Sequence, residues 1–305
     1  MPASPYTDLD RPPLNARTVQ RGLVVPGGLW RRIDVVPRTG STNADVLAAA
    51  RGGEPEGLVL LAEEQTDGRG RLGRAWSSPP RAGLSFSVLL RPGVPDPGRG
   101  WPAAAPRGYG WLPLLAGVAL LDTVTRLAEV PASLKWPNDL LVGLPGERAD
   151  GQSAEPVPGR QAKCAGILAE VVGGDAAAAV VLGLGLNVTL RAGELPVGPT
   201  GLPATSLLLA GARATDRGPL LRALLRGLAD WYARWRAAGG DAQACGLREA
   251  YARGCGTLGQ QVRVVLPGGT DLTGTAVSID PDGCLVVRTP GGDQSVTAGD
   301  VVHLR

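Results

Sequence analysis

The pattern of apolar residues changes near residue 257, and this change constrains the fold more than any other feature of the sequence. Beyond that point, short alternating apolar stretches are separated by Gly-rich turns such as PGG and DPDG, which are hairpin signals. We predict strands at 260–267, 272–283, 284–289 and 295–304. Residues 256–305 should therefore form a small antiparallel barrel of SH3-like size, with a structural or docking role rather than a second active site.

The residues before this point mix helical and strand patterns, which predicts a larger α+β domain over 29–255. Its first helix should begin at the capping residues Ser41, Thr42 and Asn43 and end at the glycine pair 52–53. Further helices are expected at 111–129, 203–210, 215–238 and 243–253. Strands are expected at 56–65, 82–92, 132–142, 163–173 and 178–188.

Three segments lack these patterns. Residues 1–28 are Pro-rich without periodicity, so we expect a loosely ordered N-terminal segment. Residues 92–108 are rich in Pro and Gly, and residues 143–161 are polar, so both are interpreted as insertions.

Charge and cysteine usage exclude several function classes. A net charge of +3 is too mild for binding bulk nucleic acid, no apolar run is long enough to span a membrane, and no export signal is present. We expect a soluble cytoplasmic protein. The four cysteines form no CxxC pair and His303 is the single histidine, which argues against a zinc site and a Cys-His nucleophile. The chemistry should rest on Arg, Lys, Asn, Asp and backbone donors.

The stretch EEQTDGRGRLGRAW, residues 63–76, interleaves three glycines with three arginines. Glycine keeps the backbone free to adopt unusual conformations, and guanidinium forks suit carboxylates and phosphates. The stretch fits a solvated basic turn, a nucleic-acid contact or a flap that orders around an anionic ligand. Composition alone favours the solvated turn.

Five ordered motifs resemble those of the biotin protein ligase family, over about residues 32–303. They are GSTN at 40–43, the Arg/Gly stretch, KWPNDLLV at 135–142, KCAGILAE at 163–170 and GLGLNV at 183–188. The resemblance implies a mixed-sheet catalytic domain of the biotin/lipoate ligase type, followed by an SH3-like domain. It also implies that ATP and Mg²⁺ are used to activate biotin as biotinyl-5′-AMP. The biotinyl group would then pass to a lysine of a biotin carboxyl carrier protein or domain.

The same resemblance assigns residues to roles, with no metal ligand among them. Catalysis is assigned to Lys163, Arg69, Arg71 and Asp139. Biotin binding is assigned to Ser41, Thr42, Asn43, Gln65, Gly68, Arg69, Lys163 and Gly166. ATP or adenylate binding is assigned to Arg71, Arg74, Trp76, Lys135, Asn138 and Asn187.

The residues themselves leave plainer interpretations open. Ser41 and Thr42 are also helix caps, Lys135 and Lys163 could be ordinary strand-end lysines, and Trp76 alone would be assigned to the core. Asp139 is expected to orient the carrier amine or accept its proton, with Mg²⁺ coordination as the lesser alternative.

Other functions fit parts of the sequence. A lipoate or octanoate ligase would share the fold but should lack the GRGRxGR sequence. A non-catalytic nucleic-acid-binding module would explain the arginines, but such a module should also carry aromatic residues between the basic ones on its binding face. The sequence also departs from repressor-type family members in having no N-terminal DNA-binding domain, so no specific DNA binding is expected. A homodimer stays open.

Overall fold

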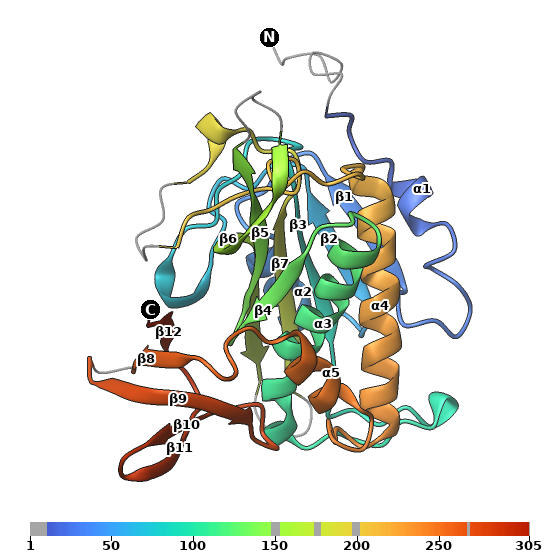
Figure 1. Cartoon of the computed structure of the whole chain (residues 1–305). Helices are drawn as coiled ribbons and strands as arrows, with labels where there is room; N and C mark the ends of the chain where they lie inside the picture. The colour runs from blue at the N-terminus through green and yellow to red at the C-terminus, as the bar shows by residue number, and fades with distance from the viewer. Residues whose placement is uncertain (1–10, 148–152, 174–177, 197–201, 267–268, 305) are drawn as a thin grey trace.

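A seven-stranded mixed sheet forms the centre of the larger domain (Figure 1). The structure, a computed structural model, describes residues 11–147, 153–173, 178–196, 202–266 and 269–304. The strand order is β1-β2-β3-β7-β6-β5-β4. The strands are β1 Arg32–Val36, β2 Leu58–Ala62, β3 Gly83–Leu90, β4 Ala132–Lys135, β5 Asp139–Glu147, β6 Ser153–Val172 and β7 Ala179–Asn187. β1 and β2 are parallel and joined through helix α2, Thr42–Arg51, whereas the other neighbours are antiparallel.

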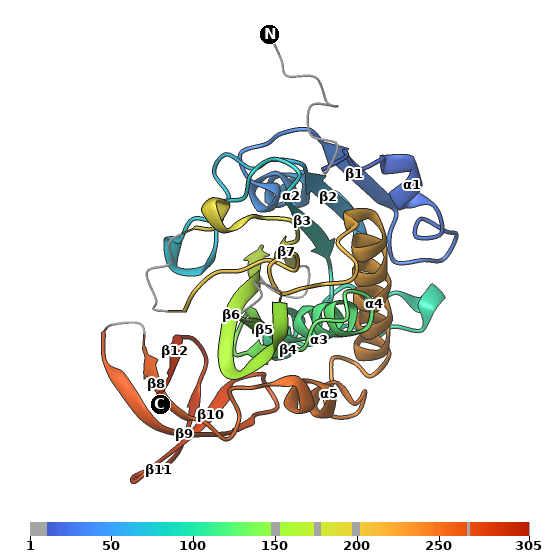
Figure 2. The same cartoon turned by 45° about the horizontal axis from the view of Figure 1, so that its top comes forward.

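Alternation along β3 decides what each face of the sheet packs against. Phe86 and Val88 point into the main core with helices α3, Trp111–Arg126, and α4, Arg217–Ala237. Leu89 packs instead with Val46 of α2, on the opposite face. Figure 2 shows α3 and α4 together on one side of the sheet and α2 on the other. Polar and small side chains on the α2 face are therefore available for a site.

The second domain is a five-stranded antiparallel sheet of order β11-β10-β9-β8-β12, reached through α5, Leu247–Gly254. Its strands are β8 Gln261–Val265, β9 Asp271–Ile279, β10 Leu285–Thr289, β11 Gly292–Val296 and β12 Asp300–His303. The α+β class and the SH3-like second domain are confirmed. The single strand expected at 295–304 is wrong, because this segment divides into β11 and β12 at a turn.

The described part of the N-terminal segment is more ordered than expected. Helix α1, Ala16–Gln20, is capped by Asn15, whose side chain accepts from the Thr18 N–H. Val19 and Leu23 are buried in the main core, and the Gln20 side chain donates to the Ile33 carbonyl. Proline content indicated little regular structure, but these apolar anchors fix 11–28 against the domain. Residues 1–10 lie outside the described residues.

The helix expected at 203–210 is wrong. Its first part runs extended, because the Lys163 N–H donates to the Pro203 carbonyl and the Thr205 N–H donates to the Lys163 carbonyl. The Leu207 N–H then donates to the Asn187 carbonyl before a turn over 207–211. Pairing with β6 and β7 satisfies backbone groups that a helix would otherwise have bonded internally.

Two further expectations need correction. The strand expected at 132–142 is a hairpin, β4 and β5, around a turn that contains the cis Trp136–Pro137 peptide bond. The insertion expected at 143–161 instead extends β5 and β6 as a paired arm, with register partners Gly143 and Gln161. Residues 148–152 within it lie outside the described part.

The Pro/Gly segment at 92–108 packs into the main core rather than lying over the surface. Two short 3-10 helices, η2 Pro97–Arg99 and η3 Pro106–Gly110, surround the buried Trp101. The Trp101 ring meets Tyr232 edge-on, with centroids 5.7 Å apart, and the Arg236 guanidinium lies 5.3 Å from its centroid. Trp101 thus anchors this segment to α4.

Among the helices that the structure describes, none is long and apolar enough to cross a membrane.

Candidate ligand-binding site

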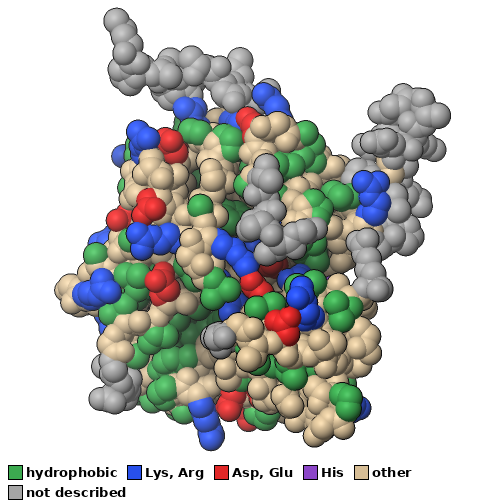
Figure 3. Space-filling view, turned by 90° about the vertical axis from the view of Figure 1, so that its left-hand side faces the viewer, with side chains coloured by type: hydrophobic (Ala, Val, Ile, Leu, Met, Phe, Trp, Pro, Cys, Tyr) green, Lys and Arg blue, Asp and Glu red, His purple; other side chains and the backbone are tan. Residues whose placement is uncertain are grey.

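A cleft of about 1310 Å³ lies between the two domains. It is lined by the Arg/Gly stretch at 63–76, called the Arg/Gly loop from here on, and by the start of α2, strands β4 to β7 and strand β12. All of the candidate residues except Gly68 line it. Figure 3 shows basic and acidic side chains close together near the middle of this face of the molecule. The folded chain therefore brings together motifs that lie more than one hundred residues apart in sequence.

One end of the cleft is neutral and rich in hydrogen-bonding groups. Ser41 caps α2, with its side chain accepting from the Ala44 N–H at 3.5 Å. The backbone N–H and the hydroxyl of Thr42 both donate to Gln65 Oε1, at 2.8 and 3.0 Å. Behind them, the buried Ser87 hydroxyl lies 2.8 Å from Thr42 Oγ1 and 2.6 Å from Asn43 Oδ1. This connected network fixes donors and acceptors around a small polar ligand group.

Glycines at 183 and 185 make room for this end of the site. A Cβ on Gly183 would lie 2.1 Å from Asn43 Oδ1, and one on Gly185 would lie 2.2 Å from the Trp76 ring. A Cβ on Gly166, the register partner of Gly185, would lie 3.3 Å from the same ring. Any side chain at 183 or 185 would therefore displace a residue of the site.

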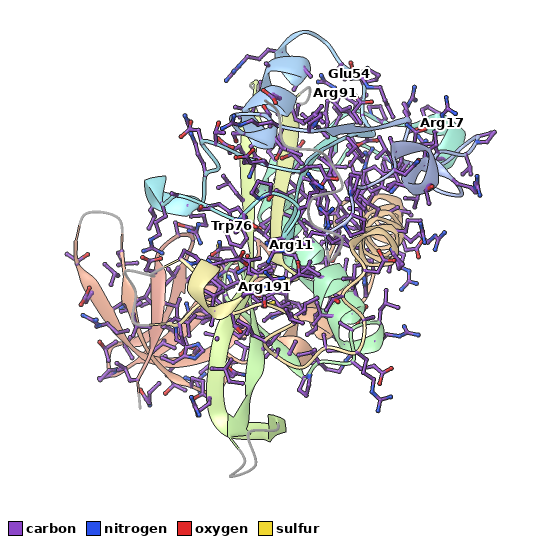
Figure 4. All side chains as sticks on the ribbon, turned by 90° about the horizontal axis from the view of Figure 1, so that it is seen from above. Arg11, Arg17, Glu54, Trp76, Arg91 and Arg191 are labelled. Atoms are coloured by element: carbon purple, nitrogen blue, oxygen red, sulfur yellow. The ribbon has the colours of Figure 1, made fainter. Side chains whose placement is uncertain are left out.

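Trp76, labelled in Figure 4, is the last residue of the Arg/Gly loop, and its ring lies against the sheet beside Gly185. Its indole N–H has no hydrogen-bond partner among the described residues although the atom is buried. The ring lines the cleft rather than the main core, which favours the ligand-stacking interpretation over the core interpretation.

The Arg/Gly loop closes on itself as a narrow ribbon. The Trp76 N–H donates to the Gly68 carbonyl and the Gly70 N–H donates to the Arg74 carbonyl, at 2.8 and 2.7 Å. A Cβ on Gly68 would lie 2.4 Å from the Trp76 carbonyl oxygen, so this close approach requires glycine. Gly68 thus shapes the base of the loop and stands outside the cleft lining.

The other end of the cleft is cationic. Arg71, Arg74, Lys135 and Lys163 face it, against the carboxylates of Asp139 and Asp300. Lys163 Nζ lies 2.6 Å from Asp139 Oδ1 in an ion pair. Burial lowers the pKa of Lys135, and its charge is favoured by Asp139 and opposed by Lys163. An excess of partly buried positive charge of this kind is stabilised by an anionic ligand.

Three candidates are held by contacts of their own. The Asn138 amide donates to the Ile167 carbonyl at 3.0 Å, and Arg71 donates weakly to Asn138 Oδ1 at 3.4 Å. The Asn187 amide donates to the Thr205 carbonyl at 2.9 Å. Arg69 pairs with Asp67 at 2.8 Å, and both side chains are about two-thirds exposed, at 65% and 67%. Arg69 therefore lies at the rim of the cleft. The two asparagines instead hold the backbone carbonyls of neighbouring segments in place around it.

Sequence reasoning missed several residues that line or support the cleft. They are Ser87, Glu170, Gly183, Gly185, Asp300 and His303. Glycines two apart in a buried strand signal a close approach on one face and could have been found. Asp300 and His303 gave no local signal, because only domain packing brings β12 to the cleft.

A site with these two ends can bind a ligand that is neutral and polar at one end and strongly anionic at the other. The cationic groups can compensate charge when two anions are brought together. Among the described residues, no group of three or more His, Cys, Asp or Glu side chains is arranged to hold a metal ion.

Comparisons with known proteins match both domains of the chain. Residues 35–187 match the model of the biotin/lipoate A/B protein ligase family, and residues 257–304 match that of the biotin protein ligase C-terminal domain. The chain is 44% identical to the biotin–acetyl-CoA-carboxylase ligase of Mycobacterium tuberculosis, over 98% of this chain and 100% of that protein. It is 30% identical to the bifunctional ligase/repressor BirA of Bacillus spizizenii, over 88% of this chain and 72% of that protein.

Solved structures show the same fold. A biotin protein ligase from Aquifex aeolicus, in complex with biotin and ATP, superposes with a TM-score of 0.64 at 23% identity. The match covers 90% of this chain and 100% of that one. With both family models matched in order and a full-length relative at 44% identity, the chain belongs to the biotin protein ligases of the biotin/lipoate A/B protein ligase family.

Proposed function

We propose that this protein activates biotin with ATP as biotinyl-5′-AMP and transfers the biotinyl group to a lysine of a biotin carboxyl carrier protein or domain. The observation that carries the proposal is the two-ended cleft. Its neutral end, around Thr42 and Gln65, suits the ureido ring of biotin, and its cationic end suits the triphosphate of ATP. The relative from Mycobacterium tuberculosis is named for ligation of biotin to acetyl-CoA carboxylase, which supports this substrate pair.

Both chemical steps use substrate nucleophiles. A carboxylate oxygen of biotin attacks the α-phosphorus of ATP, and pyrophosphate leaves. The neutral amine of the carrier lysine then attacks the acyl carbon of the adenylate, AMP leaves, and the amine gives up a proton. The enzyme therefore needs to position the reactants and compensate charge rather than supply a nucleophile.

The contacts in the cleft suggest how the candidate residues divide this work. Lys163 lies 3.4 Å from a Cβ position on Gly166, next to the Trp76 ring, so it stands where the two ends of the cleft meet. We assign it to the biotin carboxylate and the α-phosphate, and Lys135 and Arg71 to the other phosphates. We assign Asp139, which pairs with Lys163 at 2.6 Å, to accept the proton of the incoming amine.

Mg²⁺ belongs in this scheme as the counter-ion that accompanies ATP. Mg²⁺ in such sites keeps several waters and is held mainly through phosphates, with few protein carboxylates. Few carboxylates line the cleft, which fits a metal brought in with the nucleotide.

Three further properties are part of the proposal. We place the protein in the cytoplasm, because its four cysteines are all free. We expect no sequence-specific DNA binding, because the net charge of +3 is mild. Homodimerisation stays a hypothesis.

The test of the function is ATP–pyrophosphate exchange with biotin, lipoate or octanoate as the acyl substrate. Exchange should depend on biotin and be near background with the other two acids, because they lack the ureido group that Thr42 and Gln65 would bind. Incubation with a carrier domain should then modify one lysine, detected by mass. Equal exchange with lipoate, or no biotin-dependent exchange, would contradict the proposal.

Ligand should also protect the Arg/Gly loop from hydrogen exchange. Residues 66–76 bury little apolar surface, with Leu72 65% exposed, so their amides should exchange quickly in the free protein. Biotin and ATP together should slow that exchange, because the bound adenylate supplies anionic partners for the loop arginines. Mass spectrometry of the two states checks this expectation, with strand β10 as an internal reference. Equal exchange of the loop in both states would remove the flap role.

A further inference from the structure

Strand β12 brings the second domain to the cleft at two points. At its start, the Asp300 carboxylate accepts a hydrogen bond from the Arg74 guanidinium of the Arg/Gly loop and forms an ion pair with it. At its end, His303 Nε2 lies 3.1 Å from the Thr257 hydroxyl. That hydroxyl accepts a hydrogen bond from the backbone N–H of Trp136, in the turn between β4 and β5. Figure 1 shows the loop and β12 on the same side of the molecule. Through these contacts the second domain reaches both the Arg/Gly loop and the turn between β4 and β5.

The second domain is firmly attached on the side of that turn. The indole N–H of the buried Trp136 donates to the Gly283 carbonyl at 3.2 Å, and that of the buried Trp111 donates to the Pro281 carbonyl at 2.7 Å. The Gly256 N–H donates to the Leu134 carbonyl at 2.8 Å. The donors of two of these bonds are buried indoles, which would be costly to leave unpaired, so the second domain is held against the larger domain.

The loop, in contrast, has few anchors. Within the described chain, side-chain hydrogen bonds join its tip, residues 69–74, to residues outside the loop at two places. Arg71 reaches Asn138 at 3.4 Å, and Arg74 reaches Asp300. The Leu72 side chain is 65% exposed, so apolar burial adds little. The stronger of the two anchors therefore comes from the second domain.

The place of Asp300 suits an anchor better than a competitor for phosphate. Its side chain is 31% exposed and that of Arg74 is 38% exposed, which places the pair at the rim of the cleft. Burial lowers the pKa of Arg71, and the charge of Asp300 opposes that shift without a direct bond. Arg71, Lys135 and Lys163 thus line the cleft without a bond to Asp300, while Arg74 is paired with β12.

We propose that Asp300 is a positioning residue: by pairing with Arg74 it holds the Arg/Gly loop over the cleft and slows the escape of the bound acyl-adenylate. The inference about the adenylate rests on the proposed function. It gives the second domain a part in the reaction, as the fixed support of the flap. It also reassigns Arg74 from a direct nucleotide contact to a member of this latch.

The test compares Asp300→Asn with the parent protein. Partly exposed ion pairs contribute modestly, so amides of 68–76 should exchange about two- to fivefold faster in the ligand-free variant. Biotinyl-AMP should dissociate faster by a similar factor, while the rate of its formation stays within about twofold. Asp293→Asn is the matched control, because it removes an exposed pair with Arg288 in the same domain, away from the cleft.

A charge swap extends the test. Arg74→Asp combined with Asp300→Arg should restore slow exchange of the loop relative to either single variant. An Asp300→Asn protein with parental loop exchange and parental adenylate release would overturn the latch. A lower KM for ATP with unchanged release would also overturn it, because Asp300 would then be competing with phosphate. The ligand-free exchange tests the latch even if the parent made no adenylate, an outcome that would count against the function alone.

Discussion

Arg236→Met is expected to lower the free energy of unfolding by about 3–5 kcal/mol, the cost of removing one partner from a buried charged network. The Arg236 side chain is fully buried at the end of α4. It donates to the carbonyls of Arg91, Val94 and Pro102 and to the Tyr232 hydroxyl, and lies 3.8 Å from Glu56. Methionine fills the stem of the side chain but supplies none of these donors.

Urea denaturation measures this effect, with Arg234→Met as the matched control. Arg234 lies on the exposed side of the same helix, so its loss should cost less than about 0.5 kcal/mol beyond its contact with Trp231. In Arg236→Met the hydrogen exchange of 92–104 should rise with that of α4, because Arg236 joins the two. A variant as stable as the parent would mean that these carbonyls find water instead.

Features encoded by neighbouring residues could be predicted from the sequence. The capping side chain of Ser41 and the glycine at 52 fix the ends of α2, because both act within one turn of the helix. The hairpin signals of the second domain likewise act over a few residues. The expected helix at 203–210 failed for the opposite reason, since strands β6 and β7 supply its backbone partners.

The site follows the same division. Motif resemblance found Lys135, Lys163 and Trp76, and the structure brings them into one cleft. It could not find Asp300, because the partner of that carboxylate lies 226 residues away and depends on how the two domains pack. The biotin contact at Gly68 stays a prediction, and the structure adds a local reason for glycine there, because a Cβ would meet the Trp76 carbonyl oxygen.

The two lysines of the chain are the clearest link between sequence and chemistry. The sequence has 29 arginines and only two lysines, Lys135 and Lys163, and both line the cleft. A chain that uses arginine almost everywhere else has lysine at these two places. A compact, rotatable ammonium differs from a planar fork in how closely it can approach one oxygen among several. Replacing either lysine by arginine is therefore not a conservative change.

Lys163→Ala is accordingly expected to slow adenylate formation by a factor on the order of 10² to 10³, the range seen when one preorganised charge-stabilising donor is removed. Attack of a carboxylate on a phosphate concentrates negative charge on oxygens near Lys163, so the ammonium stabilises the transition state more than the separated reactants. Biotin affinity should fall less, because the network of Thr42, Asn43 and Gln65 is untouched. Lys163→Arg should restore the rate only in part.

Single-turnover formation of the adenylate, followed together with equilibrium binding of biotin, separates the two effects. Arg160→Ala is the matched control, because it removes an exposed cation from the same strand, three residues away and outside the cleft lining. Its rate should stay within about twofold of the parent, as expected for an exposed substitution. If Lys163→Ala formed adenylate within threefold of the parent rate, its ion pair with Asp139 would be structural. Lys135, partly buried beside it, would then be the group that compensates the α-phosphate.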